Sequence, residues 1–158
     1  MKKVYLALGS NLGDRAATLA NALAQMESPE LHVLRASSVY ETEPRELADQ
    51  PWFLNQVAEV ETSLFPRQLL TRLKRLEIAL GRRPSVPKGP RTIDIDILFY
   101  GDAVVSTPDL TIPHPGITER RFVLEPLAEL APDLRHPKTG KAIRELLAAV
   151  ASQRLRQV

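Results

Sequence analysis

Residues 92–100 read Thr-Ile-Asp-Ile-Asp-Ile-Leu-Phe-Tyr, the most strongly strand-like pattern of the chain. Apolar and acidic residues alternate through its first half, as in a strand with one buried face and one polar face. Residues two apart in a strand share a face, so the three isoleucines are expected to be buried together. Asp94 and Asp96 would then project side by side from the opposite face, about 7 Å apart along the backbone.

Three further strands and two helices are predicted before this stretch. Apolar alternation marks the strands, and leucines at helical spacing mark the helices. Pro66 is tolerated in the first turn of a helix, and Gly81 is well placed to end that helix. The predicted order is strand 4–8, helix 14–27, strands 32–40 and 55–62, a helix from Pro66 to Gly81, and strand 92–100.

This βαββαβ order predicts an α+β fold, the ferredoxin-like sandwich, with the helices packed on one face of the sheet. Ligands are then expected on the open face of the sheet or at its edge. The later residues predict C-terminal strand and helix additions, namely extended pieces near Val104 and Leu110 and helices over 118–130 and 142–151. At 158 residues with 44% hydrophobic side chains, we expect one domain over residues 1–158 and a monomer.

The composition limits the classes of function. The chain has no cysteine, so a bound metal would rely on carboxylates, imidazoles or the ligand itself, which favours a hard cation such as Mg²⁺. The net charge of +2 is smaller than the basic excess that nucleic-acid-binding proteins often show. No apolar run reaches membrane-spanning length and no secretion signal is visible, so a cytoplasmic protein without membrane or nucleic-acid partners is expected.

Basic residues precede the acidic pair in an irregular stretch, residues 82–91. Taken alone, such a run is typical of a solvated basic patch. The acidic pair alone is equally consistent with an amphipathic strand whose polar face is exposed to water. Together they match the layout of phosphoryl-transfer sites, where a polyphosphate lies between metal ions and arginines. The basic residues are Arg82, Arg83, Lys88 and Arg91.

Other candidate residues have structural alternatives. Glu77 and Lys74 would form an ordinary ion pair on a helix surface. His114 lies between two prolines and is either structural or a phosphate donor. Phe53 and Phe122 fall outside the predicted core segments, where a flat ligand could stack between them, although core packing is the commoner role of phenylalanine.

The order and spacing of several motifs between residues 4 and 135 resemble the hydroxymethyldihydropterin pyrophosphokinase family. The motifs are Leu-Gly-Ser-Asn-Leu-Gly at 8–13, residues 40–44, Gln-Pro-Trp-Phe-Leu-Asn at 50–55, Glu77 with Gly81-Arg82, Gly-Pro-Arg-Thr-Ile-Asp-Ile-Asp at 89–96, and Pro113-His114 with Arg120 and Phe122. The resemblance implies that the chain transfers the diphosphate of ATP to 6-hydroxymethyl-7,8-dihydropterin in folate biosynthesis, releasing AMP.

The resemblance also implies roles for individual residues. Asp94 and Asp96 would bind two Mg²⁺ ions together with ATP, and Arg82 and Arg91 would join them in catalysis. The ATP-binding residues would be Glu77, Arg82, Arg91, His114 and Arg120. The pterin-binding residues would be Thr42, Pro44, Phe53, Asn55 and Phe122.

The chain also departs from some members of the family. The loop between Arg82 and Gly89 is one residue shorter and carries Pro84, Pro87 and Lys88 in place of further arginines and a tryptophan. Phe53 stands where some members have tyrosine, and Lys74 stands where some have glutamine. No residue stands out as a general base.

Two other classes remain open on the sequence. An RNA-recognition domain shares the βαββαβ order but needs exposed aromatic residues on its central strands. A nonenzymatic regulator could bind nucleotide on the same scaffold.

Overall fold

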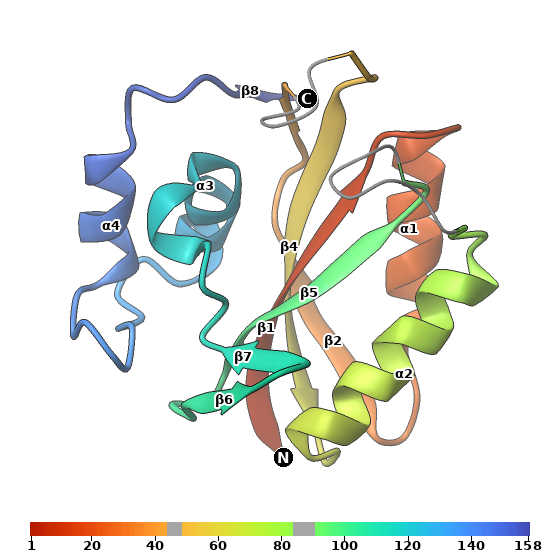
Figure 1. Cartoon of the computed structure of the whole chain (residues 1–158), viewed down its shortest axis with the longest axis horizontal. Coiled ribbons are helices and arrows are strands. Elements are labelled where there is room, and N and C mark those ends of the chain that lie inside the picture. Colours follow the sequence, from red (N-terminus) through yellow and green to blue (C-terminus); the bar gives the residue numbers. More distant parts are fainter. Residues whose placement is uncertain (44–48, 84–90) are drawn as a thin grey trace.

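One antiparallel sheet of six strands forms the centre of the computed structural model, which describes residues 1–43, 49–83 and 91–158 (Figure 1). The sheet order is β5-β1-β4-β3-β8, and β2 also pairs with β4. The strands are β1 (Lys2–Ser10), β2 (Leu31–Ala36), β3 (Tyr40–Thr42), β4 (Phe53–Thr62), β5 (Asp94–Tyr100) and β8 (Arg156–Gln157).

Four helices and a short hairpin complete the described part of the chain. The helices are α1 (Arg15–Met26), α2 (Pro66–Ala79), α3 (Arg121–Leu130) and α4 (Ile143–Ala149), and a 3-10 turn, Ile117–Glu119, precedes α3. The hairpin joins β6 (Val105–Thr107) to β7 (Leu110–Ile112). The predicted C-terminal strand and helix additions are confirmed.

The first two helices begin and end where the sequence predicts. The Asp14 side chain caps α1 by accepting a hydrogen bond from Ala17 N over 3.1 Å. Pro66 occupies the first turn of α2, where its missing amide leaves no hydrogen bond unmade. Gly81 follows the helix with φ +100°, a conformation that glycine adopts without steric cost.

The predicted strand over residues 32–40 is two strands, β2 and β3, both paired with β4. Ser37 separates them, because its backbone N donates to Val57 O and its hydroxyl oxygen accepts from Val57 N, each over 2.9 Å. The side chain of Ser37 thus completes one hydrogen bond of the strand pairing. The strand β8 was not predicted, since two residues are too few to show a periodic pattern.

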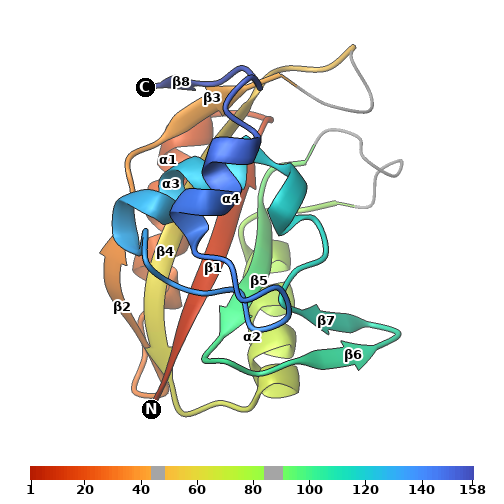
Figure 2. The ribbon, with the colours of Figure 1, turned by 90° about the vertical axis from the view of Figure 1, so that its left-hand side faces the viewer.

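Helices cover both faces of the sheet, not one face as the βαββαβ order predicts (Figures 1 and 2). The cores explain the difference. Leu6, Leu8 and Ile95 pack with α1 and α2, whereas Tyr5, Val57 and Phe99 pack with α3 and α4. The central strands are therefore apolar on both faces, and each face needs a covering layer.

The strand β5 shows the predicted alternation and then a β-bulge. Ile93, Ile95 and Ile97 are buried in the core that includes α1 and α2, which confirms their common face. Ile97 pairs with Leu6 and Phe99 with Tyr5, so Leu98 is the extra residue. The carboxylates of Asp94 and Asp96 line a cleft on the opposite face, near the start of α3.

Candidate active site

A cleft lies between the sheet and the segment that leads into the first turn of α3, and it encloses about 900 Å³ of space, part of it open to solvent. Its floor comes from three adjacent strands, β5, β1 and β4. Nine of the residues predicted from the sequence line it: Thr42, Phe53, Asn55, Arg91, Asp94, Asp96, His114, Arg120 and Phe122. The fold therefore gathers residues from five segments of the chain into one place.

The acidic pair lies among two arginines and a histidine. Arg82 Nη1 donates to Asp94 Oδ1 over 2.8 Å, and Arg91 Nη1 donates to Asp94 Oδ2 over 3.3 Å. His114 Nε2 lies 4.0 Å from Asp96 Oδ2. Burial, and then the neighbouring charge of Asp94, raise the pKa of Asp96 above its usual range. The site therefore favours an additional positive charge close to Asp96.

Glu77 and Arg82 connect α2 to β5 from the side of α2. Glu77 is only 2% exposed, and its Oε2 accepts a hydrogen bond from Ile95 N over 2.7 Å. Arg82 Nη1 lies 3.3 Å from the same oxygen, and Lys74 Nζ lies 3.5 Å from Oε1. Burial raises the pKa of Glu77. The Lys74 pair is thus present, but Glu77 is buried and is not on the helix surface.

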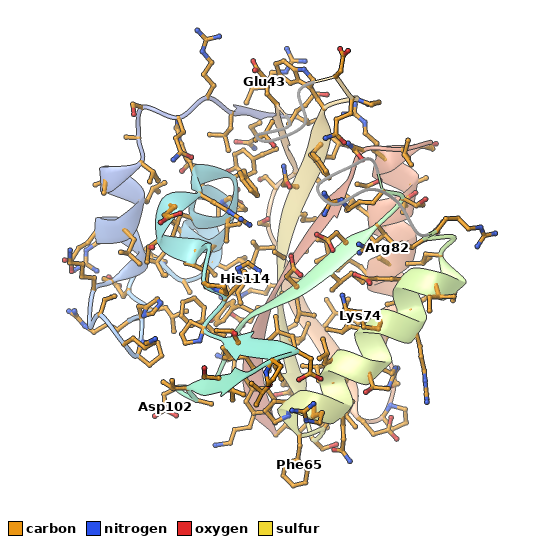
Figure 3. All side chains as sticks on the ribbon, viewed as in Figure 1. Glu43, Phe65, Lys74, Arg82, Asp102 and His114 are labelled. Atoms are coloured by element: carbon orange, nitrogen blue, oxygen red, sulfur yellow. The ribbon has the colours of Figure 1, made fainter. Side chains whose placement is uncertain are left out.

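Neither Glu77 nor Arg82 lines the cleft. Figure 3 shows Lys74 and Arg82 on the α2 side of β5 and His114 on its other side. Arg82 reaches the acidic pair through its hydrogen bond to Asp94, whereas Glu77 contacts Arg82 and the β5 backbone. The assignments of Glu77 and Arg82 to ATP stay predictions.

His114 is oriented by two hydrogen bonds. Its backbone N donates to Leu98 O, the bulged residue of β5, over 3.0 Å. Gly116 N donates to His114 Nδ1 over 3.1 Å. Because Nδ1 accepts this bond, a neutral imidazole carries its proton on Nε2, the nitrogen that faces Asp96. His114 is therefore prepared to donate a hydrogen bond toward an anion in the cleft.

Aromatic and amide groups form another part of the lining. Asn55 Nδ2 donates to Thr42 Oγ1 over 2.7 Å, and both side chains are buried. The guanidinium of Arg91 lies 5.3 Å from the centre of the Phe53 ring, and that of Arg120 lies 5.8 Å from the Phe122 ring. Rings, amides and cations together can hold a flat polar heterocycle beside an anion.

Asn11 belongs to the motif at residues 8–13, but no role was predicted for it from the sequence. Its Oδ1 accepts from Arg91 N over 2.8 Å, and its Nδ2 donates to Gln50 Oε1 over 2.8 Å and to Pro51 O over 3.0 Å. Asn11 thus ties the β1–α1 turn to the segments before β4 and β5. The only signal in the sequence is an asparagine directly after a predicted strand, and the burial of its side chain is seen only in the structure.

Gly9 was also missed. A Cβ at this position would lie 3.3 Å from Asn55 Oδ1 and 3.7 Å from Phe53 Cδ1. Glycine therefore leaves open the part of the cleft between these two side chains. Several residues named from the sequence lie outside the described residues, namely Pro44, Pro84, Pro87, Lys88 and Gly89.

The described residues show neither a preformed metal site nor a membrane-spanning helix. In residues 1–43, 49–83 and 91–158, no group of three or more acidic, histidine or cysteine side chains is placed to hold a metal ion. Among the helices of these ranges, none combines the length and apolar character that crossing a bilayer requires.

Comparison with known proteins identifies the family. Residues 5–132 match the sequence model of 7,8-dihydro-6-hydroxymethylpterin-pyrophosphokinase (HPPK). The chain belongs to this family. The matched range includes the whole lining of the cleft, so the HPPK family resemblance of the motifs is confirmed.

Similar relatives within the HPPK family come from bacteria and fungi. The chain is 44% identical over 150 residues to 2-amino-4-hydroxy-6-hydroxymethyldihydropteridine pyrophosphokinase of Pseudomonas aeruginosa, covering 94% of this chain and 92% of that protein. It is 43% identical over 155 residues to folic acid synthesis protein fol1 of Pneumocystis carinii, covering 98% of this chain and 21% of that protein. The chain thus spans about a fifth of the fungal relative's length.

Solved structures share the fold. The crystal structure of wild-type Plasmodium falciparum HPPK-DHPS with STZ-DHP superposes with a TM-score of 0.78 at 19% identity, covering 96% of this chain and 43% of that chain. At this identity the likeness supports the mixed α/β architecture alone.

Proposed function

We propose that this chain transfers the β,γ-diphosphate of ATP to the hydroxymethyl group of 6-hydroxymethyl-7,8-dihydropterin, a step of folate biosynthesis. The hydroxymethyl oxygen attacks the β-phosphorus, and the bond from that phosphorus to the oxygen bridging to the α-phosphate breaks. AMP leaves with the bridging oxygen, the hydroxyl proton is released, and the pterin diphosphate remains.

The observation that carries the proposal is the content of the cleft in a chain of the HPPK family. Asp94, Asp96, Arg91 and His114 supply the charged groups for a polyphosphate, and Asn55 with the aromatic rings supplies the groups for a pterin. Both sets line one cleft, as a transfer between two bound substrates requires.

The side chains present fit Mg²⁺. Asp94 and Asp96 are hard oxygen donors on one strand face. Burial, and after it the charge of Asp94, raise the pKa of Asp96, and a bound cation would offset both effects. Because the described residues offer two carboxylates and not a full ligand set, phosphate oxygens and water would supply the remaining ligands. We propose two Mg²⁺ ions bound with ATP, which would neutralise charge on the phosphates.

On the ATP side, the protein positions the phosphates and stabilises charge. Arg82 and Arg91 would bind nonbridging oxygens from the place where they now hold Asp94. The Nε2–H of His114 and the guanidinium of Arg120, which also line the cleft, would donate further hydrogen bonds to the phosphates. Of these groups, the His114 ring is already oriented by its hydrogen bond from Gly116 N, whereas Arg91 and Arg120 would have to turn. Glu77 would act near the nucleotide by holding Arg82.

On the pterin side, the protein orients the hydroxymethyl group. Phe53 and Phe122 would stack on the two ring faces, and Asn55 and Thr42 would hydrogen-bond the ring edge. Arg91 and Arg120 now lie over the two phenylalanine rings, so they would turn toward the phosphates when the pterin enters. Pro44 would complete the pterin site.

Further properties follow as proposals. The order β5-β1-β4-β2 with two crossover helices on one face supports a ferredoxin-like core, to which the C-terminal elements add a second layer. We also propose that residues 1–158 form one domain that acts as a monomer in the cytoplasm.

The reaction can be tested by separating the products. Purified protein with Mg²⁺, ATP and the pterin alcohol should form AMP and pterin diphosphate in equal amounts, and no AMP should appear without the pterin. Formation of ADP would indicate a transfer of one phosphate and would contradict the proposal. Binding of ATP without turnover would favour the nonenzymatic regulator.

A further inference from the structure

The strand β8 lies beside the strand that carries Thr42. It pairs antiparallel with β3, with Glu41 opposite Arg156. Val158 N also donates to Val39 O over 2.8 Å. Figure 2 shows β8 along β3 at one end of the molecule. The short strand β3 pairs with β4 along its other edge, so β3 is held on both sides.

Four side chains from separate segments meet next to β8: Arg15, Glu41, Trp52 and Arg156. We call them the Glu41 cluster. Arg15 Nη1 donates to Glu41 Oε2 over 2.9 Å. Arg156 Nε donates to Glu41 Oε1 over 3.0 Å, and Arg156 Nη2 donates to the same oxygen. The hydrogen bonds from Arg156 and Arg15 lower the pKa of Glu41. Glu41 is therefore ionised at neutral pH and holds both arginines.

The cluster also holds the segment that leads into β4. Arg15 Nη1 donates to the carbonyl oxygen of Trp52 over 2.8 Å. The guanidinium of Arg156 lies 5.7 Å from the centre of the Trp52 ring, within the range of a cation–π contact. Arg156 thus contacts both Glu41 and Trp52.

Each of these two residues immediately precedes a residue of the cleft. Glu41 precedes Thr42, and Trp52 precedes Phe53. Thr42 and Phe53 are directly opposite each other in the β3–β4 pairing and both line the cleft. Since successive residues of a strand project to opposite faces, the cluster fixes this wall of the cleft from behind.

The contacts of the cluster are confined to this wall. Within residues 1–43, 49–83 and 91–158, its side chains form no hydrogen bond or ion pair with Arg82, Asp94 or Asp96. The cleft residues that a change at Arg156 reaches first are therefore Thr42 and Phe53, on the pterin side.

We propose that Arg156 is a positioning residue for the pterin. It holds Glu41 and Trp52, and these two residues hold the wall formed by Thr42 and Phe53. This inference rests on the function proposed above. Arg156 does not line the cleft, so it acts only through its neighbours.

Steady-state kinetics of Arg156→Ala test the inference. We expect the KM for the pterin alcohol to rise about fivefold, as the loss of one exposed charged contact allows. The kcat and the KM for ATP should stay within about twofold, since a change in KM alone reports lost substrate binding. Arg156→Lys should recover part of the loss, because a lysine keeps the charge beside Glu41 but not the planar contacts of the guanidinium.

Arg154→Ala is the matched control, since Arg154 is an exposed arginine two residues earlier in the same segment, and its kinetics should be unchanged. The inference is overturned if Arg156→Ala leaves the KM for the pterin unchanged. It is equally overturned if kcat, both KM values and the melting temperature all change together, because Arg156 would then serve stability alone.

Trp52 is the only tryptophan of the chain, so its fluorescence gives a test without turnover. Arg156→Ala should shift the Trp52 emission and weaken pterin binding about fivefold in a fluorescence titration. Absence of AMP formation by the wild-type protein would refute the proposed function. Unchanged pterin affinity in the variant would refute the inference about Arg156, whether or not the wild type turns over.

Discussion

Gly116 and Arg120 are packed so closely that the glycine determines where the arginine lies. A Cβ on Gly116 would fall 2.7 Å from Arg120 Cζ and 2.7 Å from Arg120 Nε. The backbone of Gly116 has φ −87° and ψ −2°, which an alanine also adopts. A substitution to alanine would therefore displace the flexible guanidinium without straining the chain.

We predict that Gly116→Ala raises the KM for ATP roughly fivefold, because a displaced Arg120 loses about 1 kcal/mol of its charged contact with the phosphates. The melting temperature should hardly change, since the displaced group is the end of a flexible side chain. Steady-state kinetics and thermal unfolding measure the two effects.

The control for Gly116→Ala is the same change made in an Arg120→Ala background. If Gly116 acts through Arg120, the second substitution should then have no further effect on the KM for ATP. An equal effect in both backgrounds would show that Gly116 acts through another neighbour.

At the scale of elements, Glu77 joins α2 to the end strand of the sheet. β5 pairs with β1 along one edge, and on α2 the buried carboxylate of Glu77 accepts the hydrogen bond of Ile95 N. The same carboxylate lies 3.3 Å from Arg82. Glu77 therefore fixes both the strand that carries the acidic pair and one of its arginines.

Loss of the Glu77 carboxylate should destabilise the protein. We predict that Glu77→Ala lowers the free energy of unfolding by about 2–4 kcal/mol, because Ile95 N and Arg82 lose a buried partner. Urea denaturation measures the effect. Glu77→Gln keeps an acceptor for Ile95 N and should lose less, and an equal loss in both variants would contradict the role of that hydrogen bond.

The local pattern of the sequence was enough to predict most elements before residue 101. The alternation in β5 placed its isoleucines in the core and its two aspartates together, because a strand has a strict two-residue period. The covering of the second face by α3 and α4 was not predicted. That arrangement depends on contacts between distant segments, such as Tyr5 and Val57 with α3 and α4, which a local pattern does not contain.

The sequence predicted some residues of the candidate site and not others. Residue types with clear chemistry, such as Asp94, Asp96 and Arg91, stood out near one another in the sequence. Asn11, Gly9 and Arg156 did not, because their contribution is to hold other segments in place. The backbone and side-chain partners of Asn11 lie 39 to 80 residues away.

For the whole molecule, the cleft depends on the two-sided covering of the sheet. α1 and α2 bury the apolar face of β5, and the segments before α3 close the other face only in part, which leaves the acidic pair accessible. The groups expected to bind ATP and those expected to bind the pterin thus share one opening. Diphosphate transfer in this cleft is expected to depend on the carboxylate of Asp96.

The most direct test compares wild-type protein with Asp96→Asn, and uses Glu61→Gln, at the far end of β4, as the control. With Mg²⁺, ATP and the pterin alcohol, we predict AMP and pterin diphosphate from the wild type and the control, and a loss of more than about 100-fold in kcat from Asp96→Asn, on the scale of a lost electrostatic group. The melting temperature of Asp96→Asn should not fall below that of the wild type. Asp96→Asn turning over at the wild-type rate would contradict the account.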